Sequence, residues 1–180
     1  MLFTVCALTF QTPFSVSIAT SNRIASLIGA SLPNAAKVSA KVAGFLGALV
    51  GTLNVVLVLS LRNVIPKLFT SDPQVGVLIA QTIPTLAAFQ LFDALATCCN
   101  GILRGLGRQE IGGYVSLVAY YAVAMPISLG AAFGLNWKLD GLWAGVAVAL
   151  FLVFIIEFTF LCRSRWERSV EDARKRNENG

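Results

Sequence analysis

The residue best placed to do chemistry in this sequence is Asp93, the only charged side chain between Val75 and Leu103. As a helix, that apolar run would exceed the roughly 30 Å thickness of a bilayer's hydrocarbon core. An acid at membrane depth is costly, so it is expected to face a bundle interior or an aqueous cavity. One carboxyl in such a place can exchange a proton for another cation. The structural alternative is a buried acid that hydrogen-bonds a neighbouring helix and holds the bundle together.

Further polar residues follow Asp93 along one helical face. Gln90, Asp93, Thr97 and Asn100 stand at i, i+3, i+7 and i+10, which is helical spacing. The other three side chains are therefore expected to hydrogen-bond the acid in either protonation state. The sequence RGLGRQ after them predicts the end of the helix, because glycines stop a helix and arginines belong in water or among headgroups.

The composition restricts the fold to an all-α, membrane-embedded bundle. Hydrophobic residues make up 56% of the sequence and charged residues 13%, with a mean hydropathy of +0.74, as in polytopic membrane proteins. The net charge of +5 does not indicate nucleic-acid binding, because the basic residues gather between apolar runs and in the tail. The absence of histidine excludes histidine metal sites and Ser-His-Asp catalysis, so neither an enzyme nor a cofactor is expected.

The apolar segments predict five transmembrane helices, at about residues 2–28, 42–61, 75–103, 111–135 and 141–162. Gly44, Gly47 and Gly51 share a face of the second, which predicts close packing of another helix. Glu157, late in the fifth, is expected to snorkel or to pair with an arginine. The four cysteines lie in or at the ends of apolar runs, which indicates buried thiols rather than a disulfide framework.

Residues 163–180 form a basic tail of a different composition. Its acid-before-base pairs favour a short surface helix, expected to be solvated, although its basic residues can also contact anionic lipids. Eleven of the fourteen Lys and Arg residues fall on the tail side when the loops alternate, so the positive-inside rule places the C-terminus in the cytosol. Five spans would then put Met1 outside, so the chain is expected to be a fragment of a longer protein, natural or from a truncated gene model.

Three stretches resemble the C-terminal lobe of eukaryotic multidrug and toxic compound extrusion (MATE) transporters, most closely the fungal members. They are residues 13–37, PFSVSIATSNRIASLIGASLPNAAK; residues 101–129, GILRGLGRQEIGGYVSLVAYYAVAMPISL; and Gly141, Leu142, Trp143 and Gly145, followed at the end by Ala-Arg-Lys-Arg. The second is similar to the family's Arg-Gly-x-Gly-x-Gln-x-Ile-Gly run. Ser26 and Ser116 stand where the family has asparagine, and Ser31 where it has glycine.

The resemblance implies twelve spans in two six-helix lobes, with the segments here corresponding to spans eight to twelve. Asp93 then aligns with the family's acid in span ten, whereas a second acid, a glutamate in span seven, lies outside this sequence. The implied activity is export of organic cations or xenobiotics in exchange for protons or sodium, at the plasma or the vacuolar membrane. Without the N-terminal lobe the fragment is expected to be inactive alone.

Other residues receive roles under this hypothesis. Tyr120 and Tyr121 are expected to offer cation–π contacts, with one of them facing away from the cavity. Pro84 and Pro126 are expected to be bending points for alternating access. A flippase for lipid-linked sugars, from the same superfamily, is less favoured because no arginine stands in mid-span. A truncated membrane protein without transport activity is the remaining alternative.

Overall fold

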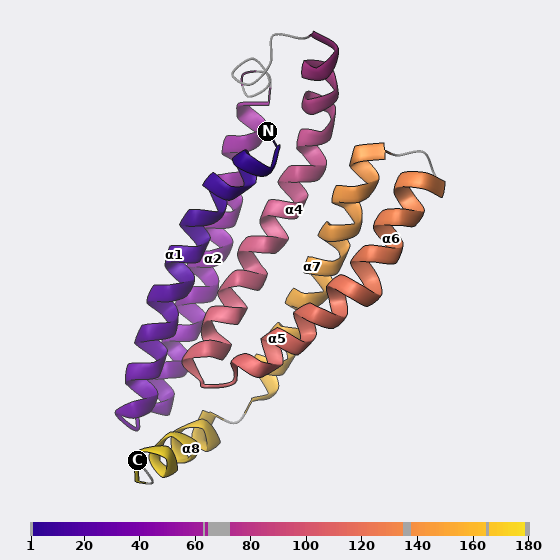
Figure 1. Cartoon of the computed structure of the whole chain (residues 1–180). Helices are drawn as coiled ribbons and strands as arrows, with labels where there is room; N and C mark the ends of the chain where they lie inside the picture. Colours follow the sequence, from indigo (N-terminus) through magenta and orange to yellow (C-terminus); the bar gives the residue numbers. More distant parts are fainter. Residues whose placement is uncertain (1, 63, 65–72, 135–137, 165, 179–180) are drawn as a thin grey trace.

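The computed structural model describes residues 2–62, 64, 73–134, 138–164 and 166–178, and every regular element among them is a helix (Figure 1). In chain order these are α1 (Leu2–Gly29), α2 (Pro33–Ser60), α4 (Pro73–Gly105), α5 (Gln109–Val118), η1 (Ala119–Ala124), α6 (Met125–Leu129), η2 (Gly130–Gly134), α7 (Lys138–Arg163) and α8 (Trp166–Glu178). The all-α fold class is thus confirmed.

Four stretches are long and apolar enough to cross a membrane: Pro33–Ser60, Thr82–Gly105, Gln109–Ala132 and Gly141–Arg163. The described part of α1 is not among them, so the fifth span stays a prediction. α2 begins at Pro33, well before the predicted start of its segment at residue 42. Lys37 and Lys41 interrupt an apolar run without interrupting a helix, and Pro33 suits a first turn, where no N–H is needed.

α4 is the central helix of the bundle. It packs against α1, α2, α5 and α7, whereas α1 and α7, and likewise α2 and α7, do not contact one another in the described chain. The predicted glycine face of α2 is confirmed at two positions, because a Cβ on Gly47 would lie 2.9 Å from Cys98 Cβ and one on Gly51 would lie 3.1 Å from Ala94 Cβ. These glycines let the α2 and α4 backbones approach closely.

The fourth apolar segment is one continuous but irregular helix, in which η1 and η2 are π-helical. The N–H of Met125 donates to the carbonyl of Tyr120, five residues back. Pro126 has no N–H and its ring crowds the preceding turn, and the widened turn lies directly before it. The predicted bending point at Pro126 therefore coincides with a local change of hydrogen-bond pattern. α6 is tied to α7 by the Ser128 hydroxyl, which donates to the carbonyl of Leu142 at 3.1 Å.

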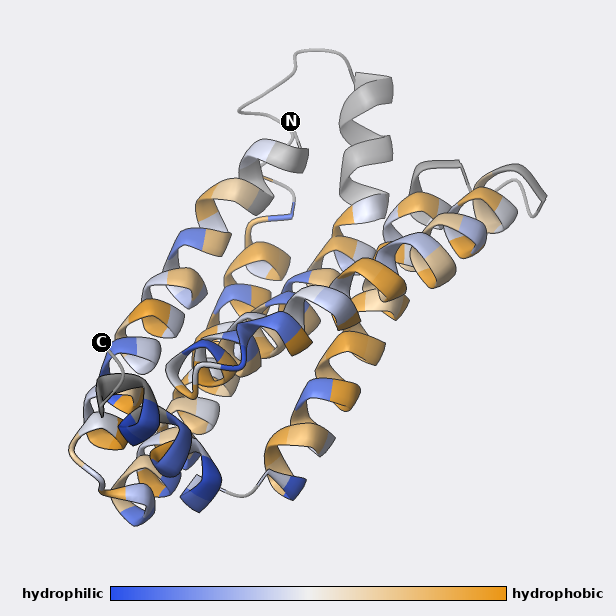
Figure 2. Cartoon of the chain, turned by 60° about the horizontal axis from the view of Figure 1, so that its bottom comes forward, coloured by the Kyte–Doolittle hydropathy of each residue, from blue (hydrophilic) through white to orange (hydrophobic). Residues whose placement is uncertain are grey.

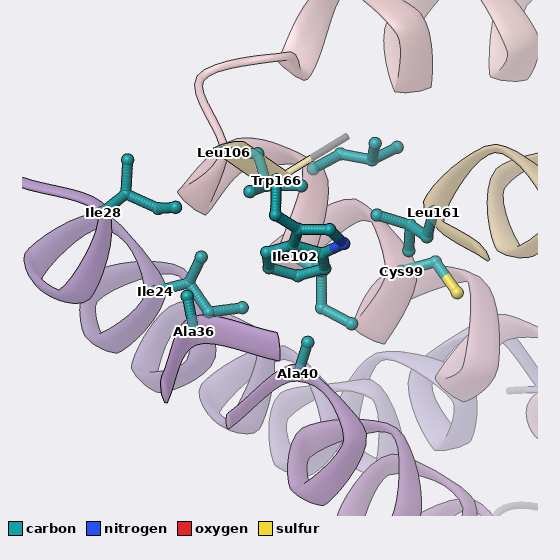
Figure 3. Close-up of a cluster of buried hydrophobic side chains, with 10 residues drawn as sticks. Ile24, Ile28, Ala36, Ala40, Cys99, Ile102, Leu106, Leu161 and Trp166 are labelled. Atoms are coloured by element: carbon teal, nitrogen blue, oxygen red, sulfur yellow. The ribbon is translucent and has the colours of Figure 1, made fainter. Parts of the chain in front are cut away.

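The tail helix α8 packs against the ends of α1 and α2 instead of extending into solvent. Figure 2 shows its hydrophilic residues together at one end of the bundle. Figure 3 shows the Trp166 ring directed at Ile102, with Ile24 on one side and Leu161 on the other; Trp166 is 7% exposed. The expected i, i+4 pair forms, with Lys175 Nζ 3.3 Å from Glu171 Oε1. The expectation of a solvated tail is wrong for the face that carries Trp166.

Candidate functional site

The polar residues of α4 do not converge on one point. Gln90 is buried, and its Nε2 donates to Thr9 Oγ1 of α1. The carbonyl of Thr97 accepts a 2.8 Å hydrogen bond from Ser17 Oγ, also in α1. Asn100 turns the other way, toward α7. None of the three hydrogen-bonds Asp93 within the described chain, so the expectation that they hydrogen-bond the acid is not met.

Asp93 points between the two helices that flank this side of α4. At about 100° per residue, it lies about 60° from Gln90, which contacts α1, and about 60° from Ala96 on the other side. Ala96 belongs to the apolar cluster shared with α7. Since α1 and α7 do not contact one another, Asp93 keeps part of its surface exposed. No hydrogen bond or ion pair joins it to another described residue.

The tyrosines differ in their relation to this acid. Tyr120, in η1, is 40% exposed and lies near Asp93. Tyr121 is 70% exposed. The two line a cavity of about 220 Å³ together with Ala124, Met125, Ser128 and Val146. Asp93 is not part of that lining, so this cavity does not bring the acid and the tyrosines into one site.

A second buried acid forms a polar cluster that the sequence did not predict. Glu157 of α7 is fully buried, and Asn100 Nδ2 donates to both of its carboxyl oxygens, at 3.0 and 3.2 Å. Gly112 of α5 closes the cluster: a Cβ there would overlap Asn100 Oδ1 and lie 3.3 Å from Glu157 Oε1. The expectation that Glu157 snorkels or pairs with an arginine is wrong, because its side chain turns inward to Asn100.

A signal for this cluster was present in the sequence. Glu157 has apolar neighbours on both sides, as Asp93 does, and Asn100 and Glu157 are both polar groups inside apolar segments. Such groups form hydrogen bonds with one another when they are buried.

Pro84, the other predicted bending point, is exposed and lies within α4, and the helix continues through it.

The comparisons with known proteins agree with this arrangement. The MatE family model matches residues 1–129. The chain belongs to the MATE family. It is 35% identical over 97% of its length to an uncharacterized transporter of Schizosaccharomyces pombe, and 32% identical over 98% to multidrug and toxin extrusion protein 2 of Mus musculus. The crystal structure of the eukaryotic MATE transporter AtDTX14 superposes on 97% of the chain with a TM-score of 0.93 and 30% identity.

The resemblance to MATE transporters is therefore confirmed, and with it the assignment of the chain as an integral membrane protein. The match covers 32% of the S. pombe transporter, 31% of the mouse protein and 39% of the AtDTX14 chain. The chain thus spans about a third of the length of the curated relatives it matches. Asp93 and Tyr120 lie on segments within the matched residues.

Proposed function

We propose that this chain supplies the cation-exchange site of a MATE exporter, with Asp93 as the group that binds a proton and an organic cation in turn. The relatives' names support a transporter, since they include multidrug and toxin extrusion proteins. The organic-cation substrate, the proton as coupling ion and the cytosolic position of the C-terminus are parts of the proposal.

One observation carries it: Asp93 has no hydrogen-bond or ion-pair partner in the described chain and points between two helices that do not touch. A carboxylate at membrane depth without a partner is costly, and a proton or a cation relieves the same charge. Two ligands that use one charge exclude each other, which is the requirement for antiport.

Tyr120 fits this exchange better than Tyr121. Tyr120 lies near Asp93 and is partly exposed, so an organic cation held by the carboxylate could also contact its aromatic face. Gln90 and Asn100 do not contact the cation in this scheme, because their amides donate hydrogen bonds to Thr9 and Glu157. They fix α4 on either side of Asp93 and so position the acid.

In the proposed cycle, proton binding to Asp93 from the outside releases the cation, and proton loss to the cytosol prepares the site for the next one. The change of access requires the helices beside Asp93 to shift. The π-helical turns of η1 lie next to Tyr120, and such turns are frequent at functional sites. We assign the movement to this segment, with Pro126 at its end.

The test is a chimera in which residues 1–180 replace the matching segment of the S. pombe transporter. In membrane vesicles with an imposed pH gradient, the chimera is expected to move a cationic dye, and Asp93→Asn is expected to abolish that movement at unchanged abundance. Asp172→Asn, which removes an equal charge from α8, is the matched control. Full dye movement by the Asp93→Asn chimera would remove Asp93 from the mechanism.

We further propose that the 180-residue chain does not transport alone. Alternating access in two-lobe transporters arises from one half moving against the other, and the chain spans about a third of its relatives. The same dye assay on vesicles that hold only this chain tests the point. Gradient-dependent uptake above that of empty vesicles would show that the N-terminal lobe is dispensable.

A further inference from the structure

A groove runs over α4 on the side away from Asp93. It lies between α2 and α7, which do not contact one another, and α8 closes one of its ends. Its volume is about 730 Å³. Leu95 lines it and stands two residues from Asp93, so the two side chains project about 200° apart around α4. The groove is therefore separate from the exchange site.

One end of the groove is polar and basic. Lys37, Lys41 and Ser164 line it there, beside Trp166. Lys37 Nζ makes a 2.8 Å ion pair with Glu167 of α8, whereas exposed Lys41 has no ion pair with any residue in the described ranges. The hydroxyl oxygen of Ser164 is covered and lacks a hydrogen-bond partner among the same residues. This end thus offers a ligand the unpaired positive charge of exposed Lys41.

The rest of the groove is apolar and open along its outer side. Phe45 and Phe158 stand at its edges, 70% and 52% exposed, and Ala48 and Leu95 line it farthest from the lysines. From Lys37 to Ala48 the α2 helix rises about 16 Å. That length is about half of the roughly 30 Å hydrocarbon core, which is the depth reached by one acyl chain of one leaflet.

We propose that this groove binds an anionic glycerophospholipid of the leaflet on the α8 side. One acyl chain lies along the apolar part between Phe45 and Phe158, and the phosphate meets Lys41. The charge at one end and the apolar length together favour an anionic amphiphile over a neutral lipid or a helix of a partner protein. Juxtamembrane basic residues attract such headgroups. The lipid would bridge α2 and α7, which have no direct contact.

The experiment places the whole chain in phosphatidylcholine vesicles that contain a small share of phosphatidylserine with a photoreactive acyl chain. After irradiation, mass spectrometry of the digested protein maps the crosslinks. They are expected in the peptides that contain Phe45 and Phe158, and more strongly than with photoreactive phosphatidylcholine at the same mole fraction. Lys41→Gln should lower the phosphatidylserine labelling about fivefold, the loss expected for one basic residue at an anionic surface.

Arg23→Gln is the matched control, because it removes an equal charge from the same end of the bundle, in a groove between α1 and α2. It should leave the labelling of Phe45 and Phe158 peptides unchanged. Equal labelling by both headgroups, labelling outside the groove only, or the same loss in both variants would each overturn the proposal. Circular dichroism checks that both variants keep their helices. The assay needs no transport, so its outcome is independent of the exchange role of Asp93.

Discussion

Asp93 and Glu157 are both acids within apolar helices, α4 and α7, but their surroundings differ. Glu157 is fully buried and receives both Asn100 hydrogen bonds, with Gly112 packed against the pair. Asp93 is partly exposed, points between α1 and α7, and has no hydrogen bond or ion pair with another described residue. An acid with satisfied oxygens joins helices, whereas one without partners can exchange ligands. Depth in the membrane alone therefore does not identify the functional acid.

The largest expected effect is on the rate of transport, which should depend on Asp93 and much less on Glu157. In the S. pombe chimera, Asp93→Asn should lower dye efflux more than tenfold, because the amide cannot exchange a proton. Glu157→Gln should change efflux less than about twofold, because removing a structural hydrogen-bonding charge affects transport only indirectly. Initial efflux rates, normalised to protein abundance, give both numbers. If the two variants lose efflux equally, the distinction between exchange site and structural cluster is wrong.

The next effect is on the stability of the protein, which should depend on Glu157 more than on Asp93. Glu157→Leu should lower the free energy of unfolding by about 1–3 kcal/mol, because it removes both carboxyl oxygens that accept from the half-buried Asn100 amide. Asp93→Leu removes no hydrogen bond to a described residue and should cost less. Thermal unfolding in detergent, followed by circular dichroism, compares the two. A larger loss for Asp93→Leu would mean that Asp93 is the structural acid.

Gly112 and Gly113 allow a sharper test of the cluster. A Cβ on Gly112 would overlap Asn100 Oδ1, whereas one on Gly113 would meet nothing within 4 Å. Overpacking typically costs about 1–3 kcal/mol, and alanine in a helix regains up to about 1 kcal/mol relative to glycine. Gly112→Ala should therefore destabilise the protein, and Gly113→Ala should be neutral or stabilising. The same thermal measurement decides, and equal midpoints would show that the cluster tolerates the added methyl group.

The sequence predicted the helices and the special position of Asp93 because both are local properties. Apolar length and the interruption of an apolar run are visible along the chain without knowledge of neighbours. The end of α4 in RGLGRQ and the glycine face of α2 are also local features of the sequence. The structure confirms both, because α4 ends at Gly105 and Gly47 and Gly51 of α2 pack closely against α4. The helix boundaries that failed, such as the start of α2, failed where lysines entered a helix without ending it.

The partners of the polar residues depend on which helices are neighbours, and local spacing does not contain that information. The spacing of Gln90 and Asn100 predicts one shared face of the helix. At about 100° per residue, however, their side chains point about 80° apart around the α4 axis. That is enough for one to reach α1 and the other to reach α7. Trp166 shows the same limit, because an aromatic residue after a span suits a membrane interface as well as a packed core.

The smallest expected effect concerns the two tyrosines and returns to the proposed exchange site. Tyr120 lies near Asp93, whereas Tyr121 is mostly exposed. A cation–π contact is worth about 0.5–1 kcal/mol at an exposed site, so Tyr120→Leu, which removes the ring, should shift the dye concentration for half-maximal efflux about threefold. Tyr121→Leu should leave it unchanged. A shift with Tyr121→Leu alone would place the cation in the small cavity beside Met125 rather than at Asp93, because Tyr121 lines that cavity.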